Sequence, residues 1–274
     1  ANVAVTDAGA TDLGASTVSG TLGITSAGAV TDSGTLAITG ATTISASGQD
    51  ITLDEAASTF GTLALTGANV AVTDAGATDL GASTVSGTLG ITSAGAVTDS
   101  GTLAITGTTT ISARGQDITL DESASTFGTL ALTGANIAVT DAGAVDLGAS
   151  TVSGTLGITS AGVVTDSGTL AITGATTISA SGQDITLDES ASTFGTLALT
   201  GANVAVTENA ATDLGASTVS GTFAITSGGA ITDSGTQAIT GDATFTNTAG
   251  TDDAITLDDA SNAFGGTVTF ATDS

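Results

Sequence analysis

The sequence lacks most of the residue types on which catalysis and core packing usually depend. Its 274 residues include no cysteine, proline, methionine, tryptophan, tyrosine or histidine, and only 7 phenylalanines. The absence of histidine, cysteine and lysine removes most general bases, thiol nucleophiles and Schiff-base chemistry. Paired carboxylates can cleave glycosides, but an active site should interrupt the repeats described below, and aromatic side chains that bind sugar are scarce. We therefore predict no enzymatic activity and no catalytic residues.

Positive charge is almost absent as well. Arg114 is the single basic residue against 27 acids, which gives a formal net charge of −26. Nucleic acid and anionic membrane surfaces are therefore improbable partners, because no basic face exists to displace phosphate counterions. Cations, basic surfaces or plain solubility are the interpretations that remain.

No signal peptide or transmembrane run is visible, and the chain opens on Ala1 in mid-pattern, so we expect a segment of a longer protein.

What the chain does contain is one segment repeated at a fixed period. The copies cover residues 1–67, 68–134, 135–201 and 202–274. The first two differ at only three positions, where Ala41, Ser47 and Ala56 become Thr108, Arg114 and Ser123. The third copy is nearly as similar, and the fourth is more diverged. A fixed period leaves no room for linkers, so we predict one continuous array over residues 1–274.

Short alternating strands recur within each copy. The segment 61–67 places Leu63 and Leu65 on one face of a strand and Thr62, Ala64 and Thr66 on the other. Near-copies begin at Gly20 and Gly34, and we expect these strands to form one wall of a stacked coil. Glycine, serine, aspartate and asparagine separate the strands, as corners require. Helical spacing of apolar residues is missing.

These features predict an all-β fold, a right-handed parallel β-solenoid with about three coils per repeat and about twelve in total. One division of a repeat gives coils of unequal length at residues 50–68, 69–95 and 96–116. At roughly 4.8 Å per coil, one repeat would advance about 14 Å and the whole chain about 58 Å.

Three phrases carry a family resemblance: residues 13–22 (LGASTVSGTL), 30–36 (VTDSGTL) and 50–54 (DITLD). They resemble the filamentous-haemagglutinin-like giant bacterial exoproteins with β-strand repeats, and the likeness extends over all four copies. It implies a secreted or surface-anchored β-solenoid that acts in adhesion, a sheath or a matrix. Those repeats carry no catalytic motif, so the resemblance implies no functional residue.

The acids are the first candidates for chemistry. The first copy holds six, namely Asp7, Asp12, Asp32, Asp50, Asp54 and Glu55. If Asp54, Asp74 and Asp99 follow equivalent strands, they would stack roughly 4.8 Å apart, and Ca²⁺ would relieve their repulsion through oxygen ligands. The alternative is that aspartate ends strands because it forms Asx-turns and keeps the chain soluble. No known calcium loop is present, so we predict no cofactor and assign no metal ligand, with Ca²⁺ left open.

Threonine, phenylalanine and Arg114 are the remaining candidates. Outward rows of threonine are typical of ice-binding solenoids, but they also follow from β-propensity and hydroxyl pairing; the candidates are Thr42, Thr43, Thr62, Thr66 and their copies. One phenylalanine per copy (Phe60, Phe127, Phe194 and Phe264) is expected to fill the core or cover a corner. Arg114 is interpreted as a surface substitution without a role.

Together these observations predict a structural segment of an extracellular or bacterial cell-surface filament or adhesin, which acts as a stiff rod. Three alternatives stay open: a self-assembling filament subunit, an acidic matrix protein bridged by Ca²⁺ and, more remotely, an ice-binding solenoid. The expected partners are like molecules in lateral or end-to-end association, divalent cations, or host and substratum surfaces. Nucleic acid and membrane insertion are not expected.

Overall fold

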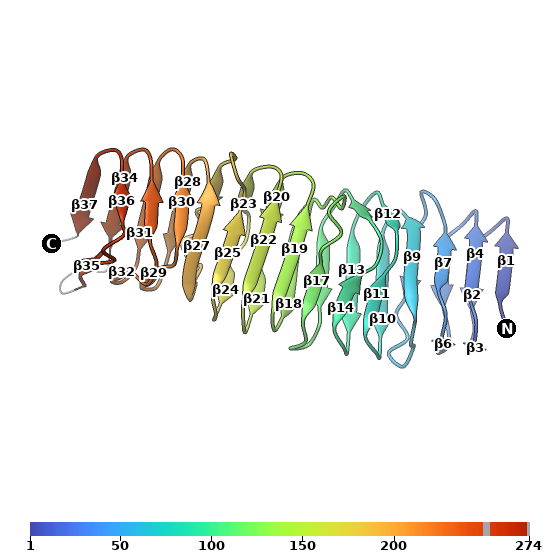
Figure 1. Ribbon diagram of the computed structural model, residues 1–274. Coiled ribbons are helices and arrows are strands. Elements are labelled where there is room, and N and C mark those ends of the chain that lie inside the picture. The colour runs from blue at the N-terminus through green and yellow to red at the C-terminus, as the bar shows by residue number, and fades with distance from the viewer. Residues whose placement is uncertain (249–252, 273–274) are drawn as a thin grey trace. The chain divides into compact units, whose positions relative to one another are not determined.

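The computed structural model describes residues 1–248 and 253–272. Its regular structure is entirely parallel β-strand, and no helix among these residues is long and apolar enough to cross a membrane. The chain divides into two compact units, Ala1–Thr140 and Asp141–Ser274. The strands of each unit are labelled in Figure 1. The predicted parallel β-solenoid with about three coils per repeat is confirmed, whereas one unbroken array over residues 1–274 stays a prediction.

Unit 1 is built from two walls of stacked strands. Wall A contains β1 (Val3–Asp7), β4 (Leu22–Ser26), β7 (Thr42–Ser45), β9 (Thr62–Gly67), β11 (Thr78–Leu80), β12 (Ser83–Val85), β14 (Val97–Asp99), β15 (Leu103–Ile105), β17 (Ile118–Leu120) and β19 (Ile137–Asp141). Wall B contains β2 (Thr11–Leu13), β5 (Val30–Asp32), β8 (Ile51–Leu53), β10 (Val70–Asp74), β13 (Leu89–Ser93), β16 (Thr109–Ser112) and β18 (Thr129–Gly134), with the short ladder of β3 (Ser16–Val18) and β6 (Leu36–Ile38).

Unit 2 has the same construction. Wall C contains β22 (Leu156–Ser160), β25 (Thr176–Ser179), β27 (Thr196–Gly201), β29 (Thr212–Leu214), β30 (Ser217–Val219), β32 (Ile231–Asp233), β33 (Gln237–Ile239), β35 (Ile255–Thr256) and β36 (Ala263–Phe264). Wall D contains β20 (Val145–Leu147), β21 (Ser150–Val152), β23 (Val164–Asp166), β24 (Leu170–Ile172), β26 (Ile185–Leu187), β28 (Val204–Glu208), β31 (Phe223–Ser227), β34 (Ala243–Asn247) and β37 (Val268–Thr272).

Each coil crosses from one wall to the other and returns. In wall A, Val3 pairs with Leu22, Leu22 with Thr42, and Thr42 with Leu63. The division of a repeat into coils at residues 50–68, 69–95 and 96–116 is therefore wrong. Within the second of these segments, Val70 already pairs with Leu89, so one coil has closed and the next has begun before residue 95.

A repeat spans three full coils and ends part-way round the next. The first repeat contributes seven successive wall segments, β1, β2–β3, β4, β5–β6, β7, β8 and β9, which alternate between walls A and B. Because seven is odd, the second repeat begins with β10 in wall B, although its counterpart β1 lies in wall A. The expected single wall of GTL strands is also wrong: β4 and β9 lie in wall A, whereas β6 belongs to the segment that follows β4 and pairs with β3 on the opposite side.

The core between the walls is narrow and aliphatic. Leu63 and Leu65 are 0% and 1% exposed, as the alternating pattern predicts, and the phenylalanines Phe60, Phe127 and Phe194 are 6–7% exposed. Glycine is required at the corner before β9, where successive coils touch. A Cβ at Gly61 would lie 2.6 Å from the carbonyl oxygen of Gly40, and one at Gly40 would lie 2.5 Å from that of Gly20.

Candidate functional site

The structure separates the acids that were expected to form a row. Asp74 ends β10 in wall B and points inward, with 1% of its surface exposed. Asp54 follows β8 in the same wall but is exposed, and Asp99 ends β14 in wall A. The predicted stack is wrong for two reasons: Asp99 lies in the opposite wall, and the pairing of Leu53 with Val72 places Asp54 beside Thr73 instead of Asp74. Within the described residues, no group of three or more acids has the geometry to hold a metal ion.

One class of acid lies inside the corner that follows a long strand. In unit 1, the Asp74 carboxylate accepts the backbone N–H of Gly76 at 2.8 Å and the Thr78 hydroxyl at 3.3 Å. The Thr78 hydroxyl also lies 3.0 Å from that of Ser93, which donates to the carbonyl of Gly76. Burial raises the pKa of Asp74, although its hydrogen bonds oppose that shift. This cluster joins two coils at a buried corner.

Glu208 occupies the corresponding corner in unit 2. It ends β28, is 2% exposed, accepts the backbone N–H of Phe194 at 3.2 Å and accepts the Thr212 hydroxyl through its other oxygen. Burial raises the pKa of Glu208 to about 7, and the two hydrogen bonds only partly offset that effect. Sequence reasoning missed this residue, although its signal was available: it is the one glutamate at a position that is aspartate in the other three copies.

A second class of acid caps the turn of the next coil. Asp99 accepts the backbone N–H groups of Asp121 and Glu122 at 2.9 and 3.4 Å, and Asp166 binds Asp188 and Glu189 in the same way. Burial raises the pKa of Asp99, the two backbone hydrogen bonds lower it, and the charges of Asp121 and Glu122 raise it further. These bonds cross between coils, whereas the bond from the Gly76 N–H to Asp74 is the local Asx-turn that was weighed against metal binding.

Wall A of unit 1 contains one unbroken column of outward hydroxyls. Strand pairing aligns Thr6, Thr25, Ser45, Thr66 and Thr84 on successive coils. The column beside it is mixed, with Ala4, Gly23, Thr43 and Ala64. An ice-binding face built on two parallel threonine rows is therefore not present in this wall.

Thr42 does not belong to the outward set. Its side chain is 0% exposed, as are those of its copies Thr109 and Thr176, and none of these three hydroxyls has a hydrogen-bond partner. The prediction that Thr42 faces outward is wrong, because it occupies an inward position of β7 opposite Leu63.

Apart from the open first coil, a surface hollow lies on each unit. A small one in unit 1 is lined by Arg114, Asp74, Thr73, Thr92 and three alanines. Arg114 itself is exposed and adopts a left-handed backbone with φ of 48° at a turn. Its neighbour Asp74 already has the hydrogen bonds described above.

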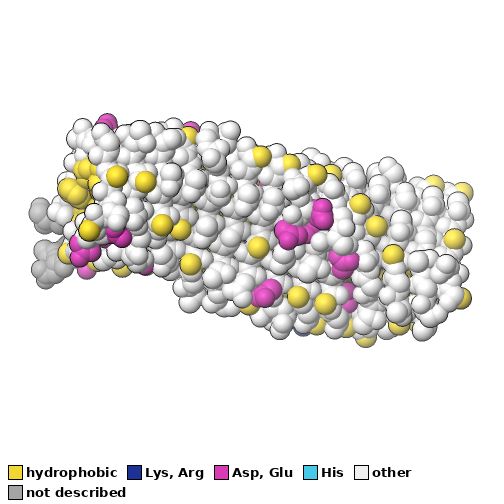
Figure 2. Space-filling model, in the orientation of Figure 1, with side chains coloured by type: hydrophobic (Ala, Val, Ile, Leu, Met, Phe, Trp, Pro, Cys, Tyr) yellow, Lys and Arg dark blue, Asp and Glu magenta, His cyan; other side chains and the backbone are white. Residues whose placement is uncertain are grey.

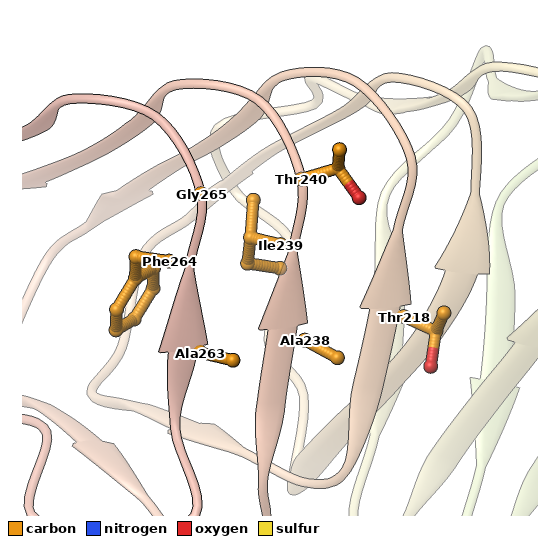
Figure 3. A pocket seen from close by; sticks show the side chains of 7 residues that line it. All are labelled: Thr218, Ala238, Ile239, Thr240, Ala263, Phe264 and Gly265. Carbon is orange, nitrogen blue, oxygen red and sulfur yellow. The ribbon is translucent and has the colours of Figure 1, made fainter.

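The other hollow is a shallow depression over β30, β33 and β36 of unit 2 (Figure 3). Small and apolar groups line it, together with two threonine hydroxyls; the residues are Thr218, Ala238, Ile239, Thr240, Ala263, Phe264 and Gly265. None of these side chains carries an acidic or a basic group. On the face drawn in Figure 2, acidic side chains gather in small separate groups rather than around a single cleft.

Stacked parallel coils, near-identical repeats and corners closed by hydrogen bonds define a tandem-repeat β-solenoid protein. The chain belongs to the family of repeats of unknown function designated DUF5649, whose model matches residues 1–66, 67–133, 134–200 and 201–271. These boundaries agree closely with the predicted repeats. No curated protein and no solved structure matches the chain. The resemblance to filamentous-haemagglutinin-like exoproteins stays a prediction.

Proposed function

We propose that this chain is a non-catalytic, stiff structural segment of an extracellular bacterial surface or matrix protein. A repetitive β-solenoid fits a structural repeat protein, and the proposal adds the location and the mechanical role. The surface hollows offer little that could recognise or transform a substrate. The resemblance to bacterial exoproteins supports the extracellular location.

The observation that carries the proposal is the strand pairing between successive repeats, called the joint below, which is the same in both units. In unit 1, Ile51 and Leu53 of β8 pair with Val70 and Val72 of β10. In unit 2, β26 and β28 pair in the same register, through Ile185–Val204 and Leu187–Val206. A repeat thus joins the next through the same backbone hydrogen bonds that join coils within a repeat, so adding copies extends the structure without a flexible joint.

Side-chain hydrogen bonds also cross the same joint. Thr62 donates to Asp79 at 2.7 Å across the first joint, and Thr196 donates to Asp213 at 2.9 Å across the joint in unit 2. The backbone N–H of Leu65 donates to the Ser83 hydroxyl at 2.9 Å. These contacts link each repeat to its neighbour and oppose bending at the joint.

Particle length against copy number tests the proposal. Chains with two, four and six repeats, imaged by electron microscopy, should lengthen in equal steps of roughly 14 to 19 Å per repeat, for three to four coils of about 4.8 Å. Thr62→Val and Thr196→Val remove the hydrogen bonds to Asp79 and Asp213 and should broaden the distribution of particle curvature. Compact particles whose length does not follow copy number would contradict the mechanical role.

A further inference from the structure

Arg114 lies in an exposed turn of unit 1 and is the only residue of the chain that a trypsin-class protease can select. Proteases of this class recognise a positively charged side chain before the scissile bond through a pocket that contains an acid. The chain holds no lysine and no second arginine. Residues 114–117 are all exposed, whereas Ala113 and Ile118 on either side are 0% exposed. The Arg114 side chain and the peptide bond after it are therefore accessible from solvent.

The peptide bond between Arg114 and Gly115 is not held by the strand ladder. Within the described residues, neither the carbonyl of Arg114 nor the N–H of Gly115 takes part in a backbone hydrogen bond. The nearest bonds to the neighbouring coil involve the Ala113 N–H and the Gln116 carbonyl, at 2.9 and 2.8 Å. A single bond closes the turn, from the Gln116 N–H to the Ala113 carbonyl at 2.9 Å. The turn can therefore open locally while both flanking strands stay paired.

The backbone of Arg114 also favours opening. Its φ of 48° is the only left-handed value at a non-glycine residue in the described part of the chain. This conformation is unfavourable for a residue with a Cβ, which crowds the following carbonyl oxygen. In the equivalent turns of the first and third repeats, the left-handed residue is a glycine, Gly48 or Gly182, which has no Cβ to crowd. An extended conformation, in which proteases bind their substrates, relieves the unfavourable φ of Arg114.

We propose that the Arg114–Gly115 bond is a proteolytic processing site for a protease that selects arginine. Exposed turns with small and polar residues are preferred sites of such cleavage. Water adds across the peptide bond, so Arg114 gains a terminal carboxylate and Gly115 gains an amino group. That amino group is largely protonated at pH 7, so the net charge of the protein hardly changes.

The fold of unit 1 holds the two products together after the cut. Strands that precede the cut pair with strands that follow it: β16 pairs with β18 at four positions, β14 pairs with β17 at two, and Ala104 forms a bridge with Thr126. Ile111 and Leu132, which oppose each other in the first of these pairs, are each 1% exposed. Cleavage thus replaces a covalent connection with hydrogen bonds and packing, at unchanged shape.

Limited digestion of the folded chain with trypsin tests the site. The parent should yield two products, residues 1–114 and 115–274, by mass spectrometry and denaturing electrophoresis, and should elute as one species in native size-exclusion chromatography. Arg114→Ser introduces the residue that the first and third repeats carry at this position, and should resist digestion.

A matched control keeps one exposed arginine but moves it into a strand. Thr110 is exposed in β16, which pairs with a strand on either side. The double variant Thr110→Arg, Arg114→Ser should be cut at least about tenfold more slowly than the parent, because cleavage follows the population of the locally opened state. Thr98→Arg with Arg114→Ser, at an exposed position of β14, provides a second control. Circular dichroism verifies that each variant is folded.

Three results would overturn the proposal. The first is a parent chain that stays intact at a trypsin concentration that cleaves the urea-unfolded chain. The second is cleavage of the folded strand variants at the parental rate, which would mean that general unfolding exposes the bond. The third is separation of the two products under native conditions. None of these results changes how particle length follows copy number, so the processing site and the structural-segment function fail separately.

Discussion

Glu208 should make the stability of unit 2 depend on pH in the range where most surface acids have already ionised. Burial raises its pKa from the ordinary value of 4.5 to about 7. The folded state thus holds a proton that the unfolded state releases between these two values. The stabilisation that Glu208 contributes is complete below pH 4.5, falls as the pH rises, and is lost above about pH 7.

The size of the effect follows from the shift. A displacement of about 2.5 pKa units, at about 1.36 kcal/mol per unit, corresponds to about 3 kcal/mol between pH 4.5 and pH 8. Glu208→Gln carries no titrating proton and should remove this part of the pH dependence. Asp184→Asn, an acid-to-amide change at an exposed corner of the same unit, should retain it.

Urea unfolding followed by far-ultraviolet circular dichroism at pH 5 and pH 8 measures the difference. Urea is preferable to guanidinium chloride, because a salt would screen the charges under study. The parent chain and Asp184→Asn should lose more stability than Glu208→Gln on going to pH 8. An identical pH dependence for all three proteins would show that the Glu208 carboxyl is not held protonated in the fold, and would refute the reasoning.

Three further predictions concern packing and metal. Thr109→Val should raise the free energy of unfolding by about 1 kcal/mol, because the buried hydroxyl has no hydrogen-bond partner. Thr78→Val should lower the free energy of unfolding, because it removes the hydrogen bond to Asp74. Denaturation curves that shift in the same direction for both variants would contradict this prediction. Gly128→Ala should lower the melting temperature, because its Cβ would lie 2.4 Å from a backbone oxygen of the neighbouring coil. Gly14→Ala should leave the melting temperature nearly unchanged, because no atom lies within 4 Å of the Cβ position. Equal melting temperatures for the two variants would show that the coils can separate to accommodate the methyl group. A calcium chelator should not change the melting temperature. A clear fall would indicate that Ca²⁺ binds at the acidic turns.

The fourth repeat offers a natural parallel to the Thr109 prediction. At the position of Thr42, Thr109 and Thr176 it carries Ala243, and two positions later Phe245 replaces the isoleucine of the other copies. Both side chains are 0% exposed, and Phe245 packs edge-to-face with Phe223 and Phe264 at centroid distances of 5.8 and 6.1 Å. Loss of the hydroxyl thus accompanies a larger aromatic core at that end of the chain.

The sequence by itself determined the local structure. The fixed repeat period, the alternation around Leu63 and Leu65, and the small polar residues at the corners predicted short strands in a parallel solenoid, because side chains alternate in a strand and a fixed period requires equivalent units. It also predicted the aliphatic core and the phenylalanine that is buried in each of the first three copies. These properties depend on residues that are close together in the chain.

Only the tertiary structure decided which strands share a wall. Seven wall segments per repeat is an odd number, so β1 and its copy β10 lie in opposite walls. The expected row of Asp54, Asp74 and Asp99 does not form, because Asp99 lies in the opposite wall and the strand register places Asp54 beside Thr73. Whether an acid points into a corner, as Glu208 does, or caps a turn, as Asp99 does, depends on contacts with residues 14 to 23 positions away. The path around each coil determines those contacts, and the strand pattern alone leaves that path open.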